Sequence, residues 1–298
     1  MKKNLLLLGS IIVATHCFSQ LYVKVKPSYN KSLGGQVLTR IGSIEYTAGL
    51  NEITESSTNV RSSLGQGYMG NFSLGYSFTS QFSTELGVSY LKGKDSQGSY
   101  TINYTNSEEL STYTLTGHLF SIDPTLVFSS REKDFFRTYV SLGFPINFIS
   151  YDTYYVGTDQ PTGKTYEILE KFTGSVGVGV STKFGMITKL NESLELFGEI
   201  GFTYINFSPN KSEITSYKIG GDDSLSIFNT SDLESVYKEN IVVDYNYVDG
   251  QWIESYNTSR PRVRQKFDTP FSYLSFSFGV KIYLFTRREE MGESLNLK

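Results

Sequence analysis

Cysteine, tryptophan and histidine are nearly absent from this chain of 298 residues, which has one Cys, one Trp and two His. The single cysteine, Cys17, lies in the N-terminal segment, so the rest of the chain has no disulfide framework, thiolate metal site or cysteine nucleophile. After that segment, no stretch approaches the roughly eighteen consecutive apolar residues of a membrane-spanning helix. The formal net charge of −3, with no basic stripe, argues against a nucleic-acid partner.

The N-terminus has the pattern of a signal peptide. Two lysines precede the apolar stretch Leu5–Ala14, which is too short to span a bilayer. Small residues at Cys17 and Ser19 predict cleavage between Ser19 and Gln20, so residues 1–19 are the expected signal peptide. A lipoprotein signal, which needs a small residue just before its cysteine, is the disfavoured alternative. The sequence therefore predicts export.

Aromatic residues and glycine are abundant, with 22 Tyr, 21 Phe and 27 Gly. This composition favours an all-β chain. Apolar and small or polar residues alternate with period two, which predicts strands that have one apolar face. Pro124 is expected to mark a bulge in one of them. The eight predicted strands are Leu21–Tyr29, Tyr68–Phe78, Phe82–Tyr90, Tyr113–Phe128, Arg137–Phe148, Phe172–Met186, Leu194–Tyr204 and Leu274–Leu284.

Short and long connections alternate strictly between these strands. The short ones are Thr79–Gln81, Ser129–Asp134 and Thr188–Glu192, and the long ones are Lys31–Gly67, Gly93–Thr112, Ser150–Lys171 and Ser208–Thr269. This alternation is typical of outer-membrane proteins, which have short periplasmic turns and long extracellular loops. We therefore predict an antiparallel, up-and-down transmembrane β-barrel of eight strands over residues 20–286, with residues 287–298 as a periplasmic tail.

Aromatic residues gather near the strand ends, as the interfacial girdles of such a barrel require. On the long-loop side these are Tyr29, Tyr68, Tyr90, Phe172, Tyr204 and Phe271; on the turn side they are Phe78, Phe82, Phe128, Phe136 and Phe285.

The longest connection, residues 208–269, contains a predicted hairpin. Asp249-Gly250 separates two extended segments, and this dipeptide is a strong signal for a two-residue hairpin turn. The pairing would put Tyr247 opposite Trp252 and Tyr245 opposite Glu254. A ten-stranded barrel that includes this hairpin is the alternative, disfavoured because Glu254 would face lipid.

Alternation also assigns charged side chains to the barrel interior, where they are expected to pair and to plug a narrow lumen. A small selective channel, with Glu195 and Glu199 facing cations, is the alternative. The nine residues are Lys24, Lys26, Glu85, Asp123, Arg137, Lys183, Glu195, Glu199 and Lys281.

No catalytic, cofactor or metal site is expected. The mature chain has one histidine, His118, and its nearest serine, Ser121, is three positions away. An odd separation along a strand puts the two side chains on opposite faces, which disfavours a nucleophile–base pair. The sequence thus predicts a non-enzymatic structural or interaction protein, with a channel or transport accessory as the alternative and a lipid-modifying enzyme less favoured.

Candidate partner contacts lie in residues 208–269. Trp252 could anchor a protein partner, and a basic run just before the last predicted strand could meet lipopolysaccharide phosphates. That run comprises Arg260, Arg262, Arg264 and Lys266. Outer-membrane lipid and lipopolysaccharide are therefore the expected partners, and the sequence leaves the oligomeric state open.

Taken together, the signal ending Cys17-Phe18-Ser19-Gln20, the eight alternating segments and the final Tyr283-Leu284-Phe285 resemble the small outer-membrane β-barrel proteins of Gram-negative bacteria. The resemblance is closest to the PorT-like and related eight-stranded families. It covers the barrel region and is architectural, because these families have no sharp catalytic motif. The resemblance implies a porin-like shape and a position in the cell outer membrane. Many such barrels end on a terminal aromatic, whereas here Phe285 is followed by a charged tail.

Overall fold

The computed structural model describes residues 20–33, 37–47, 52–104, 107–131, 136–159, 162–174, 176–248, 251–255 and 257–284. These residues are almost entirely β-strand, with two short helical segments, η1 (Leu225–Ile227) and α2 (Thr230–Leu233). No helix among them is long and apolar enough to cross a membrane. The expected signal peptide, the expected tail, Phe285 and the Asp249-Gly250 turn all lie outside the described residues.

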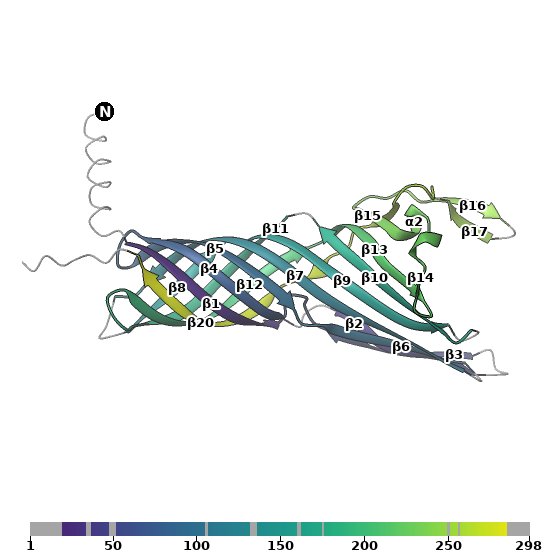
Figure 1. The fold of residues 1–298 in the computed structure, drawn as a ribbon, viewed down its shortest axis with the longest axis horizontal. Coiled ribbons are helices and arrows are strands. Elements are labelled where there is room, and N and C mark those ends of the chain that lie inside the picture. The colour runs from purple at the N-terminus through teal and green to yellow at the C-terminus, as the bar shows by residue number, and fades with distance from the viewer. Residues whose placement is uncertain are drawn as a thin grey trace, which may run out of the picture.

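Eight antiparallel strands pair in a cycle that returns to its starting strand (Figure 1). In order around the cycle they are β1 (Gln20–Ser32), β4 (Gly67–Ser77), β5 (Phe82–Gly93), β7 (Ser107–Ser129), β8 (Phe136–Gly143), β11 (Gly177–Lys189), β12 (Leu194–Phe207) and β20 (Tyr273–Tyr283). The last strand, β20, pairs with β1, which puts Val25 opposite Val280. We call these eight strands the ring.

Each of the eight predicted segments lies wholly or partly on a ring strand, but two of them are divided. Phe144 and Pro145 separate β8 from β9 (Ile146–Asp159), because proline has no backbone N–H for the ladder. The prediction of one strand over 172–186 is wrong. Its first residues end β10 (Lys164–Gly174), which lies outside the ring and pairs with β9, and most of the rest form the ring strand β11.

The bulge predicted at Pro124 is also wrong. The register between β5 and β7 runs through Leu86 opposite Pro124 without a shift. On the other side of β7, pairing with β9 ends at Ile122 and pairing with β8 begins at Thr125. Pro124 therefore lies opposite the break between β9 and β8. At that position no backbone hydrogen bond is lost because proline has no N–H.

The four long connections are not loops, which corrects the prediction. They hold β2 (Val37–Thr47), β3 (Glu52–Arg61), β6 (Ser96–Tyr104), β13 (Pro209–Ile219), β14 (Asp222–Asp223), β15 (Glu234–Lys238), β18 (Arg262–Gln265) and β19 (Thr269–Pro270). With the far ends of β7, β9 and β10, most of these strands pair in the order β3-β2-β6-β7-β9-β10-β13-β15-β18. We call this stretch of sheet, with the segments attached to it, the extension; it reaches beyond one end of the ring in Figure 1.

The predicted hairpin is present with the predicted register. β16 (Asp244–Val248) and β17 (Gln251–Ser255) pair with Tyr247 opposite Trp252 and Tyr245 opposite Glu254. They form a two-stranded sheet of their own and contribute no strand to the ring, in contrast to the ten-stranded alternative.

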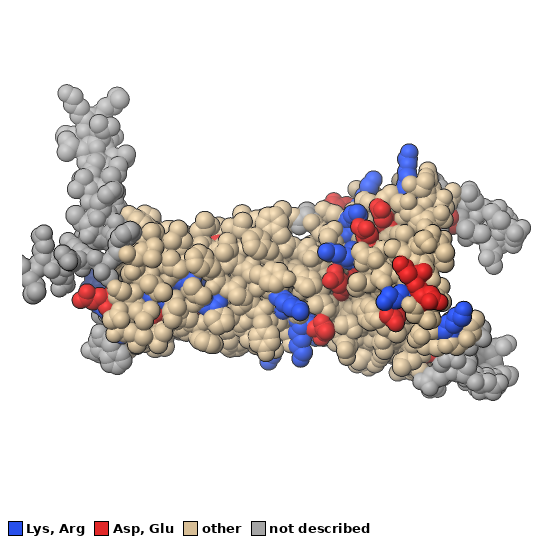
Figure 2. Space-filling view, in the orientation of Figure 1, with Lys and Arg blue, Asp and Glu red and all other residues tan. Residues whose placement is uncertain are grey.

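The outer face of the ring carries large apolar side chains, which form a belt that we call the apolar band. Phe278 is 71% exposed, and along β12 the exposed Leu196 and Ile200 alternate with the buried Phe197. Figure 2 shows few charged atoms over this part of the surface, whereas charged side chains gather over the extension. The band includes Val25, Phe72, Leu74, Leu86, Val88, Leu126, Val140, Leu142, Val178, Val180, Phe184, Met186, Leu196, Ile200, Phe202, Phe276, Phe278 and Ile282.

Exposed aromatic residues border the apolar band at both ends, but two of the aromatic residues that the sequence assigned to these girdles do not. Tyr68 and Tyr204 are exposed at the extension end, and Phe128 and Phe136 at the turn end. Phe172 and Phe271, which the sequence assigned to the girdle, are instead buried.

The return of the pairings to β1 can be tested with a disulfide. Val25 and Val280 are opposed, and directly opposed Cβ atoms lie about 4.5–5.5 Å apart, close to the separation that a disulfide needs. We expect the mature V25C/V280C variant to oxidise fully, as measured by peptide mapping with and without reductant. V25C/L126C, which joins β1 to the non-neighbouring β7, is the control and should stay reduced. Equal oxidation of the two pairs would contradict the ring.

Candidate functional site

The inner face of the ring brings the nine predicted interior charges together. Each lies on an inward position of its strand, opposite in parity to the apolar band. The bases are Lys24 and Lys26 on β1, Arg137 on β8, Lys183 on β11 and Lys281 on β20; the acids are Glu85 on β5, Asp123 on β7, and Glu195 and Glu199 on β12. All nine take part in ion pairs, which we call the interior network.

Glu195 is the centre of the part nearest the short turns. Its carboxylate lies 2.8 Å from the Arg137 guanidinium and 3.7 Å from the Lys281 ammonium. The Tyr283 hydroxyl donates to Glu195 Oε2 at 3.1 Å and accepts from Arg137 at 2.9 Å. Lys281 Nζ also lies 3.7 Å from the centre of the Tyr22 ring. These contacts provide each buried charge with an opposite charge or an aromatic face.

Glu199 and Glu85 hold the two lysines of β1. Lys24 Nζ lies 3.1 Å from Glu85 and 4.0 Å from Glu199, and Lys26 pairs with Glu199. The Tyr139 hydroxyl donates to Glu199 at 2.5 Å. The Glu199 side chain is 1% exposed, so its charge is almost completely removed from solvent and depends on these partners.

The Asp123–Lys183 pair, at 2.8 Å, lies next along the interior. Two small cavities adjoin it, each of about 20 Å³, which is room for about one water. Asp123 Oδ1, which has no hydrogen-bond partner among the described residues, faces this region. Beyond the pair, the interior is lined by small polar side chains such as Ser28, Asn71 and Ser121.

An apolar cluster, which we call the cap, fills the interior at the extension end. Leu64, between β3 and β4, and Phe271, just before β20, are both fully buried in it. The Leu64 N–H donates to the Pro270 carbonyl at 2.9 Å, and the Ser63 hydroxyl donates to the same carbonyl at 3.1 Å. Two segments far apart in the sequence are thus joined inside the ring. The rest of the cluster comprises Met69, Leu91, Leu119, Ile149, Tyr151, Phe172, Ile205, Phe207, Tyr237 and Tyr273.

Glycine permits the close approach of these segments. A Cβ at Gly117 would lie 2.6 Å from the Leu64 carbonyl oxygen, and a Cβ at Gly93 would lie 2.7 Å from the Gly117 oxygen. Both contacts are with backbone, which cannot move aside as the end of a side chain could. Glycine is therefore required at Gly93 of β5 and Gly117 of β7, on the inner face of the ring where Leu64 packs.

His118 and Ser121 lie on opposite faces of β7, as their spacing predicts. Ser121 is buried, whereas the His118 side chain is 28% exposed and its Nε2 lies 3.5 Å from Asp152 Oδ2. Among the described residues, no group of three or more His, Cys, Asp or Glu is arranged to hold a metal ion.

The structure places the four predicted basic contacts on or beside β18, in different surroundings. Arg262 pairs with Glu254 of the hairpin, and Arg264 is exposed on β18, beside β15. Arg260 is exposed in the turn before β18, and Lys266 bonds through its N–H to the Lys238 carbonyl. The backbone of Trp252 lies in β17, opposite Tyr247 of β16, and its side chain is not among those that the structure describes.

The sequence missed the three tyrosines of the interior network and the cap. Tyr22, Tyr139 and Tyr283 share the inward parity of Lys24, Arg137 and Lys281, so the same alternation could have identified them. Leu64 carries no such signal, because the connection around it has no alternating pattern.

Comparison with protein-family models gives no match to this chain, and comparison with curated proteins gives none either.

Removal of one network carboxylate should destabilise the fold. We expect Glu199→Gln to cost about 3–5 kcal/mol of unfolding free energy, because it leaves Lys26 without its buried partner. Guanidinium unfolding in lipid vesicles, followed by circular dichroism, measures the effect. The matched control is Glu213→Gln, whose pair with Lys211 is about half exposed and should contribute about 0–1 kcal/mol. Equal losses for the two variants would contradict a buried network.

Proposed function

We propose that this chain is a transmembrane β-barrel of the cell outer membrane, with a closed interior and no catalytic role. It acts as a structural or interaction component through its extension. The ring is the membrane-spanning part, and its interior network and cap fill the lumen.

The apolar band is the observation that carries this proposal. Soluble monomers rarely expose contiguous apolar patches larger than a few hundred Å². Here the large exposed apolar residues recur on all eight ring strands, while the nine charged residues of the interior network, on the same strands, turn inward. An apolar outside and a polar inside are the arrangement that a barrel in lipid requires.

The two ends of the ring support an orientation. The chain reverses through short connections at one end, and the extension continues from the other. Barrels of this kind have short periplasmic turns and larger external segments, so the extension lies outside the cell. Aromatic residues border the band at both ends, at the levels of the two membrane interfaces.

The filled interior favours an interaction role over transport. The cavities beside the interior network hold about one water each, which is too little for a continuous aqueous path. The extension, by contrast, has exposed side chains on β3 and β18 that are accessible to a partner. The architectural resemblance to PorT-like and related small barrels agrees with a protein that has no catalytic motif.

Membrane insertion can be tested by placing a charge in the band. Leu86 is 56% exposed on β5, and Leu86→Arg should cost about 2–4 kcal/mol in lipid vesicles if this position meets the bilayer core. Ile227→Arg is the control, because Ile227 is 69% exposed on the extension and an arginine there should change stability by less than about 0.5 kcal/mol. Equal stability of the two variants in vesicles would count against a lipid-facing band.

Planar-bilayer recording tests the closed interior. The wild-type protein, with its insertion verified by co-flotation with vesicles, should give no stable single-channel current, because side chains fill the lumen. A stable current altered by Glu199→Gln would refute this view and support the channel alternative.

A further inference from the structure

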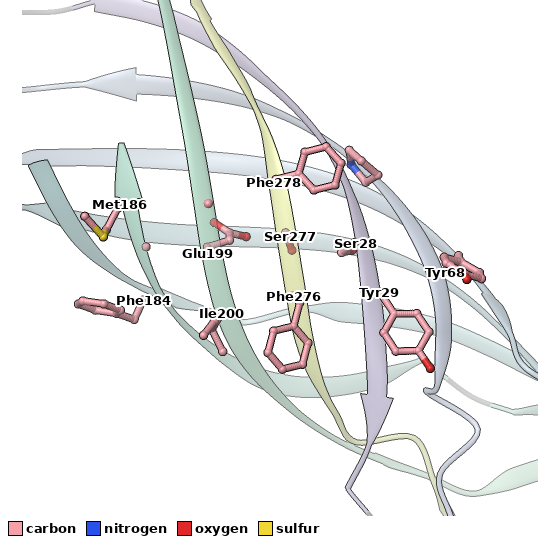
Figure 3. Close-up of a pocket in the computed structure, with 13 residues that line it drawn as sticks. Ser28, Tyr29, Tyr68, Phe184, Met186, Glu199, Ile200, Phe276, Ser277 and Phe278 are labelled. Atoms are coloured by element: carbon pink, nitrogen blue, oxygen red, sulfur yellow. The ribbon is translucent and has the colours of Figure 1, made fainter. Parts of the chain in front are cut away.

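The apolar band is hollowed beside Gly198. On the outer face of β12, Gly198 lies between Met186 of β11 and Phe278 of β20. A Cβ at Gly198 would meet nothing closer than 4.0 Å, so this position opens to the outside. The resulting groove has a volume of about 720 Å³ and is shown in Figure 3.

Apolar and aromatic side chains on neighbouring strands wall the groove. They follow one line of register, in which each residue is opposite the next, from Phe184 through Ile200, Phe276 and Tyr29 to Tyr68. This line starts near the middle of the outer face and ends where the extension begins. The Tyr29 and Tyr68 rings lie 5.4 Å apart at that end.

The walls contribute no exposed charge. Glu199 lies beneath the groove, but its side chain is 1% exposed and pairs with lysines in the interior. The groove is thus apolar along its length and aromatic at one end.

Two lysines continue this line beyond the tyrosines. A second hollow of about 470 Å³ shares Tyr29 and Tyr68 with the groove and is also lined by Lys92, Lys94 and Asp95. Lys92 is the register partner of Tyr68 on β5. Asp95 accepts a hydrogen bond from the Thr116 hydroxyl at 2.6 Å. Within the described part of the chain, neither lysine has an ion-pair partner.

We propose that the groove binds one phosphate-bearing lipid, with an acyl chain beside Gly198 and the phosphate at Lys92 and Lys94. The inference rests on the proposed function, in which the outer face of the ring meets lipid. The order of surfaces, apolar then aromatic then cationic, matches the order of acyl chain, interface and phosphate in a leaflet. The leaflet is the one nearest the extension.

The test is native mass spectrometry of the protein in mild-detergent micelles supplemented with phosphatidylglycerol or with phosphatidylcholine of the same acyl chains. One phosphatidylglycerol should remain bound to the wild-type protein, and an excess of inorganic phosphate should not displace it. The K92Q/K94Q variant should lose about tenfold in affinity for phosphatidylglycerol, as expected when charge-assisted bonds to one anion are removed.

Gly198→Leu fills the groove, and its Cβ would come no closer than 4.0 Å to the backbone, so the variant should fold and weaken the binding of both lipids. Gly70→Leu is its control, because Gly70 is also open on the outer face but does not line the groove. K164Q/K218Q on the extension is the control for the lysine pair, since it removes the same charge from two exposed lysines elsewhere.

Equal lipid retention by the test variants and their controls would overturn the inference while leaving the barrel intact, provided that the proteins still insert into vesicles. A wild-type dimer that Gly198→Leu dissociates would also overturn it, because a second copy would then be the occupant. Failure of the wild-type protein to insert would remove the proposed function and this inference together.

Discussion

The pairing of β20 with β1 is the constraint on which the rest of the structure depends. Once the first and last strands of the ring share hydrogen bonds, every ring strand has a partner on each side and side chains alternate between two faces. A residue's position along its strand then decides whether it points inward or outward. The charged interior and the apolar exterior are two consequences of this one closure.

The interior is narrow, so each charge must find its partner among side chains of other strands. Glu195 and Glu199 are four positions apart on β12; Glu195 pairs with cations of β8 and β20, and Glu199 pairs with the two lysines of β1. Most of these pairs join strands that have one ring strand between them, such as β1 and β5, and Glu195 and Lys281 are directly opposed on adjacent strands. An eight-stranded ring is just wide enough for this, since its interior is one that side chains can fill.

Much of the ring could be predicted from alternation, because one face of each strand is apolar and the other is small or polar. The nine interior charges followed from the same parity, and the structure brings all of them into ion pairs on the inner face of the ring. The extension could not be predicted in this way. Its strands expose polar residues on both faces, as in Thr54–Asn59 of β3, so they lack a period-two apolar signal and read as loops.

The cap was beyond prediction for a different reason. Leu64 is the one apolar side chain of the short segment Arg61–Gly67, and its burial depends on contacts with segments distant in the sequence. Phe172 and Phe271 fit the composition of a girdle, but Phe172 lies on β10, outside the ring, and Phe271 lies just before β20, and both are buried in the cap. Local pattern identifies which face a residue takes within a strand, but not where a strand ends.

The cap also has a consequence for the order of assembly. The Ser63–Pro270 hydrogen bond joins residues separated by 207 positions, and Pro270 lies only a few residues before β20. Such distant contacts form late, because a long loop must close first. The segment that completes the cap is thus the one that leads into β20, so filling the extension end of the interior and closing the ring depend on the same stretch of chain.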